Sequence, residues 1–400
     1  MAVAFTGLFL AVLPIPHTIA IRLIALFLAA VIVVPQVTRH EWGLLPFKWP
    51  LFIWLVVQII SLTTAVSPSY SLGAIKSQTW YGFLTYALFF FQCREAKTAK
   101  LLVIVPLVIL AVLALGGFAE WAMSASAVAP TPIYDGVGAF TTYGISVVPL
   151  LAMVAFSETG KWRSKAAIAV LLFLLLVTVY LGANRMFWLA FAVEIVVLSS
   201  LLPHRSGRYL RAWLYGVGAA ILLIATSITF YHTLQLRTGT AADGFEKVIA
   251  TTLVNDPRWP LWKFCVAKII EHPLWGVGFG LRSFAIAYPQ WPFRNPQLWH
   301  AHNVLLNCGI EMGLPGIIAF LWLMWKIIER SWLVYRTNPS YRARLVAVCA
   351  ITLVLGLLAK NMTDDFFYQD LALLFWATVG GVFGYLSVLP KTAAHTNDEL

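Results

Sequence analysis

The sequence predicts an all-α, polytopic membrane protein with about twelve transmembrane helices and one long periplasmic loop of short helices. Three observations lead to this fold class. Hydrophobic residues make up 60% of the 400 residues and charged residues only 11%, which excludes an ordinary soluble globular protein. Apolar runs of about 20 residues, the length of a helical membrane span, recur along the chain. A polar stretch, Tyr231 to Trp299, interrupts them.

The apolar runs give the predicted spans in chain order. They cover about 3–15, 19–36, 50–66, 78–92, 101–122, 137–156, 166–183, 185–202, 210–230, 304–328, 342–361 and 369–389. The first run is short, so eleven spans remain an alternative. On this division, residues 1–230 hold spans one to nine, 231–302 form the periplasmic loop, 303–390 hold spans ten to twelve, and 391–400 form a cytoplasmic tail.

The positions of Lys and Arg predict the orientation. With both termini in the cytoplasm, the short outer loops carry only Arg22, Lys76, Arg185 and Lys360, and most other basic residues lie on inner loops. Long translocated loops escape this charge rule, so the basic long loop is predicted to lie in the periplasm. The net charge of +11 is mostly this inner-face bias, and it gives no reason to expect a nucleic acid partner.

The long loop carries signals for folded structure and ends in a candidate base. Asp256 can cap a helix that starts at Pro257, and His272-Pro273 ends it. A flexible turn is expected next, at Gly276, Gly278 and Gly280. His302, directly before span ten, is a candidate general base, because an imidazole changes its charge near neutral pH. The plain alternative is an interfacial histidine that hydrogen-bonds a neighbour.

Charged groups elsewhere are further candidates. Arg258 begins the loop helix, where the helix N-terminus favours anions and a guanidinium can grip a diphosphate. Arg185 lies in the outer turn between spans seven and eight, where a snorkelling arginine is the plain reading. Asp364 and Asp365 lie in the outer connection before the last span, where either can orient an imidazole or simply cap a turn.

Two acidic residues, Glu194 and Glu311, lie well inside predicted spans, away from the span ends. Glu194 lies near mid-depth of span eight, where a charge costs about 2.5–3.5 kcal/mol, so its side chain is expected to face the bundle interior. A break of span ten at Gly313-Leu314-Pro315 would keep Glu311 near the surface, at the rim of the site.

The sequence predicts no metal and no cofactor. The first outer loop, residues 13–18, contains no carboxylate, and the acidic residues of the long loop lack His or Cys at ligand spacing. A P-loop and a nucleophile elbow are both absent from the sequence. Arginine side chains are therefore expected to neutralise a leaving diphosphate.

The string HAHNVLLNCGIEMGLPG at residues 300–316 resembles the signature of the O-antigen ligase family, in which His-Asn is followed by two spaced glycines. The upstream string EHPLWGVGFG resembles the wider set that includes O-antigen polymerases and protein O-oligosaccharyltransferases. Three further features resemble the family: Arg258-Trp259 in the loop, Arg185 in the outer turn, and the acidic turn with Asp364.

The resemblance implies a C-type glycosyltransferase architecture in the bacterial inner membrane, with the active site facing the periplasm. The enzyme would transfer a glycan from undecaprenyl diphosphate to a lipid A–core hydroxyl in lipopolysaccharide biosynthesis, without a metal and with inversion. His302, Arg258 and Arg185 would be catalytic, with both arginines on the diphosphate, and Asn303 and Asp364 would bind substrate. The partners would be the donor, the acceptor and membrane lipid.

Other functions remain open at this point. An O-antigen polymerase shares the donor chemistry, and a protein O-oligosaccharyltransferase would use a Ser or Thr hydroxyl as acceptor. A polysaccharide transporter or flippase is the alternative from a different class, and Glu194 is its main support.

Overall fold

The structure, a computed structural model, describes residues 1–123, 136–157, 162–182, 184–202, 256–365 and 367–389, with a few positions between 218 and 228. For residues 185 and 293 it describes the backbone alone. The predicted ninth span at about 210–230, the loop up to residue 255 and the tail 391–400 therefore fall largely or wholly outside the described residues.

Every regular element in the described ranges is helical. In chain order these are α1 (Ala2–Val12), α2 (Ile19–Val33), η1 (Val34–Gln36), α3 (Arg39–Leu44), α4 (Lys48–Ser61), η2 (Leu62–Thr64), α5 (Pro68–Ala74), the π-helical η3 (Ile75–Trp80), α6 (Tyr81–Gln92), α7 (Ala96–Met123), α8 (Val137–Ala155), α9 (Trp162–Leu181), α10 (Arg185–Leu201), α13 (Arg258–Glu271), α14 (Arg282–Ala287), α15 (Gln290–Arg294), α16 (Val304–Thr337), α17 (Tyr341–Asn361) and α18 (Gln369–Val388). The described part contains no strand, so the all-α prediction is confirmed there.

Seven of the described helices are long and apolar enough to cross a membrane, within 19–36, 96–123, 137–155, 162–181, 304–337, 341–361 and 369–388. Three shorter apolar helices, Ala2–Val12, Lys48–Thr64 and Met186–Leu201, lie where further spans were predicted. The chain is therefore a multi-pass membrane protein. The total of twelve spans and the C-type glycosyltransferase arrangement stay predictions.

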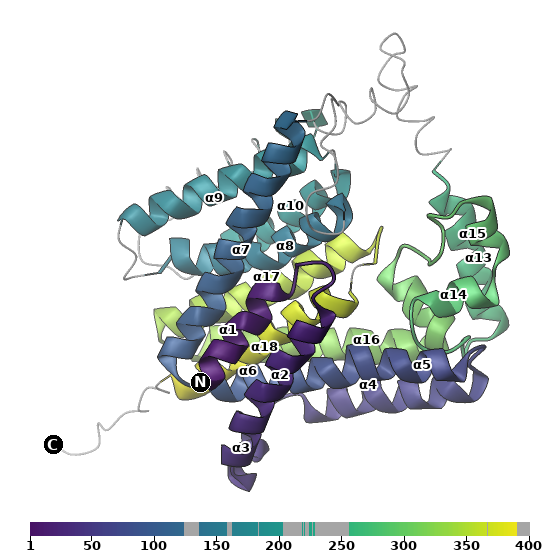
Figure 1. Ribbon diagram of the computed structural model, residues 1–400, viewed down its shortest axis with the longest axis horizontal. Coiled ribbons are helices and arrows are strands. Elements are labelled where there is room, and N and C mark those ends of the chain that lie inside the picture. The colour runs from purple at the N-terminus through teal and green to yellow at the C-terminus, as the bar shows by residue number, and fades with distance from the viewer. Residues whose placement is uncertain are drawn as a thin grey trace.

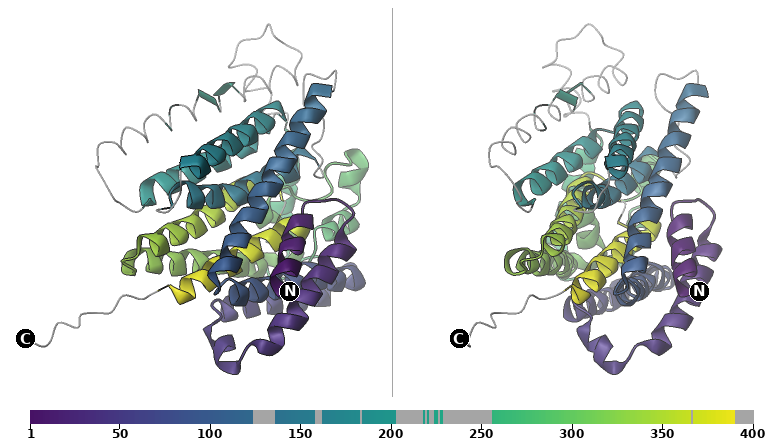
Figure 2. Two further views of the ribbon diagram at one scale, coloured as in Figure 1. Left: turned by 60° about the vertical axis from the view of Figure 1, so that its left-hand side comes forward. Right: turned by 90° about the vertical axis from the view of Figure 1, so that its left-hand side faces the viewer.

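The centre of the bundle consists of α8, α17 and α18. In each of these helices, 78% of the most apolar 18-residue segment is buried inside the protein. The buried share is only 28% for the segment that contains α2 and 22% for α9, so these two helices lie at the periphery. Figure 2 shows the hairpin of α1 and α2 on one flank of the molecule. Helices α6 and α18 pack closely, because a Cβ atom on Gly384 would clash with the carbonyl oxygen of Phe90.

Glu194 faces the interior of the bundle, as predicted. Its side chain is completely buried in α10 and touches Gly356 of α17 so closely that a Cβ atom there would lie 2.5 Å from a carboxyl oxygen. Neither carboxyl oxygen has a hydrogen-bond partner among the described residues. The contact joins α10 to the central helix α17.

Connections that were predicted to share one side of the membrane contact one another. At the predicted inner side, the Tyr341 hydroxyl donates to the carbonyl of Phe156 at 3.0 Å. At the predicted outer side, the Val66 N–H donates to the carbonyl of Val277 in the long loop, also at 3.0 Å. This grouping agrees with which connections were predicted to share a side, and the assignment of one side to the periplasm stays a prediction.

Candidate functional site

The scaffold of the site is a break in α16. Gly313 has φ +71° and ψ −166°, so the helix is interrupted at the Gly-Leu-Pro sequence where a break was predicted. Pro315 has no N–H for the carbonyl of Glu311, and the Leu314 N–H donates to the carbonyl of Pro273 at 2.8 Å. The carbonyls of Ile310 and Glu311 are therefore available to partners outside the helix.

The glycine-rich segment 276–280 supplies those partners. The N–H groups of Val277 and Gly278 donate to Ile310 and Glu311 at 2.9 and 3.1 Å. A Cβ atom on Gly276 would lie 2.2 Å from the Ile310 carbonyl oxygen, so a larger residue does not fit. The chain turns at these glycines, as predicted, and they also permit close packing against α16; the flexibility of the turn stays a prediction. The Glu311 side chain is buried, and its place at the rim of the site stays a prediction.

Helices α13, α14 and α15 form a small unit at one end of the bundle, near the start of α16 (Figure 1). Its core consists of Leu261, Cys265, Ile269, Phe284, Leu298, Ala301 and Ile310. The Arg258 N–H donates to the Asp256 carboxylate at 2.9 Å, so Asp256 caps α13 as predicted, although the helix begins one residue later. The Trp262 indole N–H donates to the carbonyl of Ala301 at 2.8 Å, which holds the chain just before His302.

Asn303 begins α16 and links it to the connection before α18. Its side-chain oxygen accepts the N–H groups of Leu305 and Leu306 at 2.9 and 3.0 Å, the arrangement of an N-cap. Its amide N–H donates to the carbonyl of Met362 at 2.7 Å. In this structure the Asn303 side chain holds two outer connections together.

His302 has a backbone conformation that is uncommon for a residue other than glycine, with φ +51°. Its N–H donates to Nδ1 of His300 at 3.1 Å, and the two imidazole rings lie against each other with centroids 3.9 Å apart. Burial lowers the pKa of His300 well below its ordinary value, and the charges of His302 and Arg258 lower it further. His300 is therefore a neutral support for the backbone and ring of His302.

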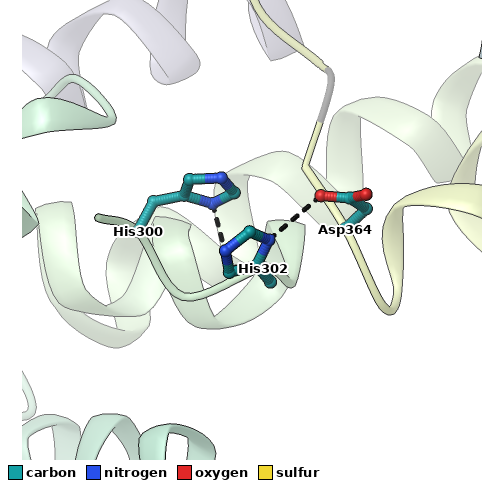
Figure 3. Close-up of side chains that lie close together, drawn as sticks. All are labelled: His300, His302 and Asp364. Carbon is teal, nitrogen blue, oxygen red and sulfur yellow. Dashed lines mark hydrogen bonds and ion pairs between the residues drawn. The ribbon is translucent and has the colours of Figure 1, made fainter. Parts of the chain in front are cut away.

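Both ring nitrogens of His302 have partners. Nδ1 lies 3.1 Å from Oδ1 of Asp364, and Nε2 lies 2.7 Å from the carbonyl oxygen of Gln297. Figure 3 shows the Asp364 carboxylate beside the His302 ring, with the His300 ring on the other side. Both partners are hydrogen-bond acceptors, so both nitrogens carry a proton in this arrangement.

The carboxylate of Asp364 is ionised. Burial raises its pKa, but the hydrogen bond from His302 and the charges of Lys360, His302 and Arg258 together outweigh burial and lower the pKa to about 2. Asp365 has a different partner. It accepts the amide N–H of Asn307 at 2.5 Å, and burial raises its pKa to about 6. The geometry therefore places Asp364, rather than Asp365, against the imidazole.

Two positive charges act on this pair from different elements. Arg258, at the start of α13, and Lys360, in the last turn of α17, both lower the pKa of Asp364. The Lys360 side chain is completely buried. Arg185 begins α10, where Asn184 caps the helix by accepting the Phe187 N–H at 3.1 Å. The Arg185 side chain lies outside the described part, so its place in the site stays a prediction.

Among the described residues, His300, His302 and Asp364 are the group that could hold a metal ion, with one ligand atom from each within 4.8 Å of the others. The sequence predicted no metal, and that expectation is untested.

Comparisons with known proteins point to one family. Residues 170–321 match the family model described as O-Antigen ligase. This part of the chain is therefore similar to the O-antigen ligase family. A protein of Rickettsia conorii named "Putative polysaccharide ligase" is 28% identical over 123 residues, which are 29% of this chain and 29% of that protein. Similarly named proteins of Rickettsia felis and Rickettsia prowazekii are 26% identical over 123 residues, 29% of this chain and 30% of each. The chain thus spans less than a third of the length of these relatives.

The range that matches the O-antigen ligase family covers Arg185, Arg258 and His302, whereas Lys360 and Asp364 lie beyond it. The fold brings residues from both sides of this boundary together. Three residues that contact His302 or act on Asp364 had no role assigned from the sequence: Gln297, His300 and Lys360. For Lys360 a signal existed, a basic residue at the outer end of an apolar run. For Gln297 no sequence pattern marked the contact, because its backbone carbonyl makes it.

Proposed function

We propose that the protein is an O-antigen ligase that works at the periplasmic face of the inner membrane. It transfers a glycan from undecaprenyl diphosphate to a hydroxyl of the lipid A–core, without a metal and with inversion at the anomeric carbon. The observation that carries the proposal is the bond between His302 and Asp364, 62 residues apart in sequence, with Arg258 and Lys360 close enough to act on it. The match of residues 170–321 to the O-antigen ligase family model supports the glycan-transfer chemistry.

His302 acts as the general base. Nε2 accepts the proton of the acceptor hydroxyl, whose oxygen forms a bond to the anomeric carbon. The bond from that carbon to the diphosphate oxygen breaks, and the diphosphate leaves with the electron pair. Asp364 keeps the proton on Nδ1, so the lone pair stands on Nε2, and its charge stabilises the imidazolium that forms. A good leaving group requires no separate acid.

Positive side chains stabilise the leaving diphosphate. Arg258 lies at the first position of α13, where the helix N-terminus also favours an anion. We propose that Arg185 joins it from the start of α10, in line with the family pattern. Asn303 is proposed as a positioning residue, since both ends of its amide already bind the protein.

The acceptor must displace one internal contact before the reaction. Nε2 of His302 is bonded to the carbonyl of Gln297, and a base needs that nitrogen free. We propose that the acceptor hydroxyl replaces this carbonyl when it binds, after the imidazole has lost the Nε2 proton. The structure therefore represents a resting arrangement, and a small movement of residues 297–300 precedes catalysis.

The proposed activity can be tested genetically. Deletion of the gene should leave lipopolysaccharide as bare core, with polymeric glycan retained on its lipid carrier. Core bearing a single repeat unit would indicate an O-antigen polymerase, and glycan trapped on the cytoplasmic face would indicate a flippase. Complementation with His302→Ala should fail, whereas His272→Ala, which removes an exposed histidine after α13, should complement. Normal complementation by His302→Ala would refute the base assignment.

A further inference from the structure

The side chains that carry the proposed chemistry also have the composition of a transition-metal site. Two imidazoles and one carboxylate, from His300, His302 and Asp364, offer ligand atoms within 4.8 Å of one another. We propose that this cluster binds a zinc ion, and that bound zinc holds the enzyme inactive. The inhibitory part rests on the proposed function, whereas the binding of zinc does not.

One edge of the cluster already has the separation of two zinc ligands. Zinc binds imidazole nitrogen at about 2.0–2.1 Å and carboxylate oxygen at about 2.0–2.2 Å, so two ligands of one ion lie roughly 3.0–3.5 Å apart. Nδ1 of His302 lies 3.1 Å from Oδ1 of Asp364. The proton between these two atoms occupies the direction in which a zinc ion would bridge them.

The third ligand needs only a local adjustment. The His300 ring lies on the His302 ring with centroids 3.9 Å apart and planes tilted by 35°. A rotation of the His300 side chain, which Figure 3 shows beside that of His302, brings one ring nitrogen from at most 4.8 Å toward the ligand separation. The His300 side chain is only 4% exposed, so the protein rather than solvent fixes its position.

The donor set selects the class of ion. Imidazole ligands favour zinc and similar transition metals, whereas Mg²⁺ and Ca²⁺ prefer sites made of oxygen atoms. Three protein ligands leave a coordination position for water. Arg258 and Lys360 act on Asp364 with positive charge, which opposes a divalent cation. We therefore expect a dissociation constant for zinc in the micromolar range. A chelator should then remove the ion readily, unlike a structural zinc ion.

Zinc binding replaces a proton with a metal at the base. The Nδ1 lone pair of His302 binds the ion, the Nδ1 proton is released to solvent, and Asp364 gives up its hydrogen bond to become a ligand. The ring keeps its Nε2 proton, which the Gln297 carbonyl accepts, so Nε2 has no lone pair with which to take the proton of the acceptor hydroxyl. Transfer stops although donor binding at Arg258 is not directly blocked.

The test uses the full chain without a polyhistidine tag, purified in detergent. Titration with zinc by calorimetry, and with Co²⁺ followed by visible absorption, measures binding without reference to activity. We expect about one ion per chain in the micromolar range. His300→Asn should weaken binding by about 10-fold or more. The asparagine introduced at position 300 can still accept the His302 N–H through its side-chain oxygen. His272→Asn is the matched control and should bind like the wild type.

The same samples test inhibition. Zinc should abolish glycan transfer, and a chelator should restore it. Each variant is compared with its own metal-free rate. If His300→Asn does not fold, Asp364→Asn takes its place in the binding titration. Absence of stoichiometric binding, or equal binding by the cluster variants, overturns the inference and leaves the proposed function untouched. Zinc bound at the cluster together with full transfer by His302→Ala would overturn the proposed function, including the inhibitory claim, and leave the metal site standing.

Discussion

Replacing Asp364 by Asn removes one negative charge beside His302 and leaves the size of the side chain almost unchanged. In the wild type, Oδ1 of Asp364 accepts the Nδ1 proton of His302, with the two atoms 3.1 Å apart. The Asn amide can instead turn its NH₂ group toward Nδ1. That arrangement places the ring proton on Nε2, the atom that must accept a proton from the substrate.

The size of the effect follows from the geometry. Two unit charges 3.1 Å apart attract by about 5 kcal/mol at an effective dielectric constant of about 20. The side chains are 12% and 19% exposed, so solvent screens part of this energy, and we expect about 3 kcal/mol to remain. That energy corresponds to roughly a 100-fold loss of kcat, and the wrong tautomer extends the expected range to about 10²–10⁴-fold.

The assay measures initial rates of glycan transfer from a polyprenyl diphosphate donor to lipid A–core in detergent. Because Asp364 acts through His302, kcat should fall while KM for the donor changes little. Asp370→Asn is the matched control, because this acid lies in the first turn of α18 and pairs with Arg22 at 3.9 Å. Its rate should stay within about twofold of wild type, with the fold checked by thermal unfolding. A rate for Asp364→Asn within about threefold of wild type would refute the reasoning.

Three further perturbations test other parts of the structure. Arg258→Lys should raise KM for the donor by about 10-fold, measured by the same assay, because Lys cannot grip a diphosphate with paired donors; an unchanged KM would exclude this contact. Gly276→Ala should lower the melting temperature by several degrees, because the new Cβ meets a backbone oxygen at 2.2 Å, whereas Gly43→Ala, with open space around it, should not. Burial raises the pKa of Cys265 to about 12, so at pH 8 about one thiol in ten thousand is ionised, and maleimide should label this residue only after unfolding; rapid labelling of the folded protein would contradict the burial.

Local patterns predicted the helices well. Apolar runs of span length gave the positions of α7, α8 and α17, since helices in a bilayer satisfy their own backbone hydrogen bonds and need little else. The break at Gly313 and the cap at Asp256 were also predictable, because proline and the capping carboxylate act within a few residues.

The site could be predicted only in part. His302 and Arg258 were marked by their positions and by a family resemblance, but the partner of the imidazole comes from a connection 62 residues away. Nothing in the string of residues 364–365 distinguishes the two aspartates. Their opposite roles arise because Asn307 binds one of them, and that contact depends on how α16 meets α17.

The glycine segment shows that composition alone does not determine how closely a segment packs. Three glycines in five residues suit a loose turn as well as a crowded one, and only the neighbour decides between them. Here the neighbour is the interrupted stretch of α16, whose unpaired carbonyls attract the segment.

The interrupted helix has a consequence for protein engineering. Backbone groups of residues 310–314 that lack a partner within the helix bond instead to Pro273, Val277 and Gly278. The two segments therefore depend on each other for their structure. A chimera that takes residues 256–303 from a homologue and keeps its own α16 would join mismatched segments. Exchanges meant to transfer acceptor preference between such proteins should therefore move residues 256–316 as a single cassette.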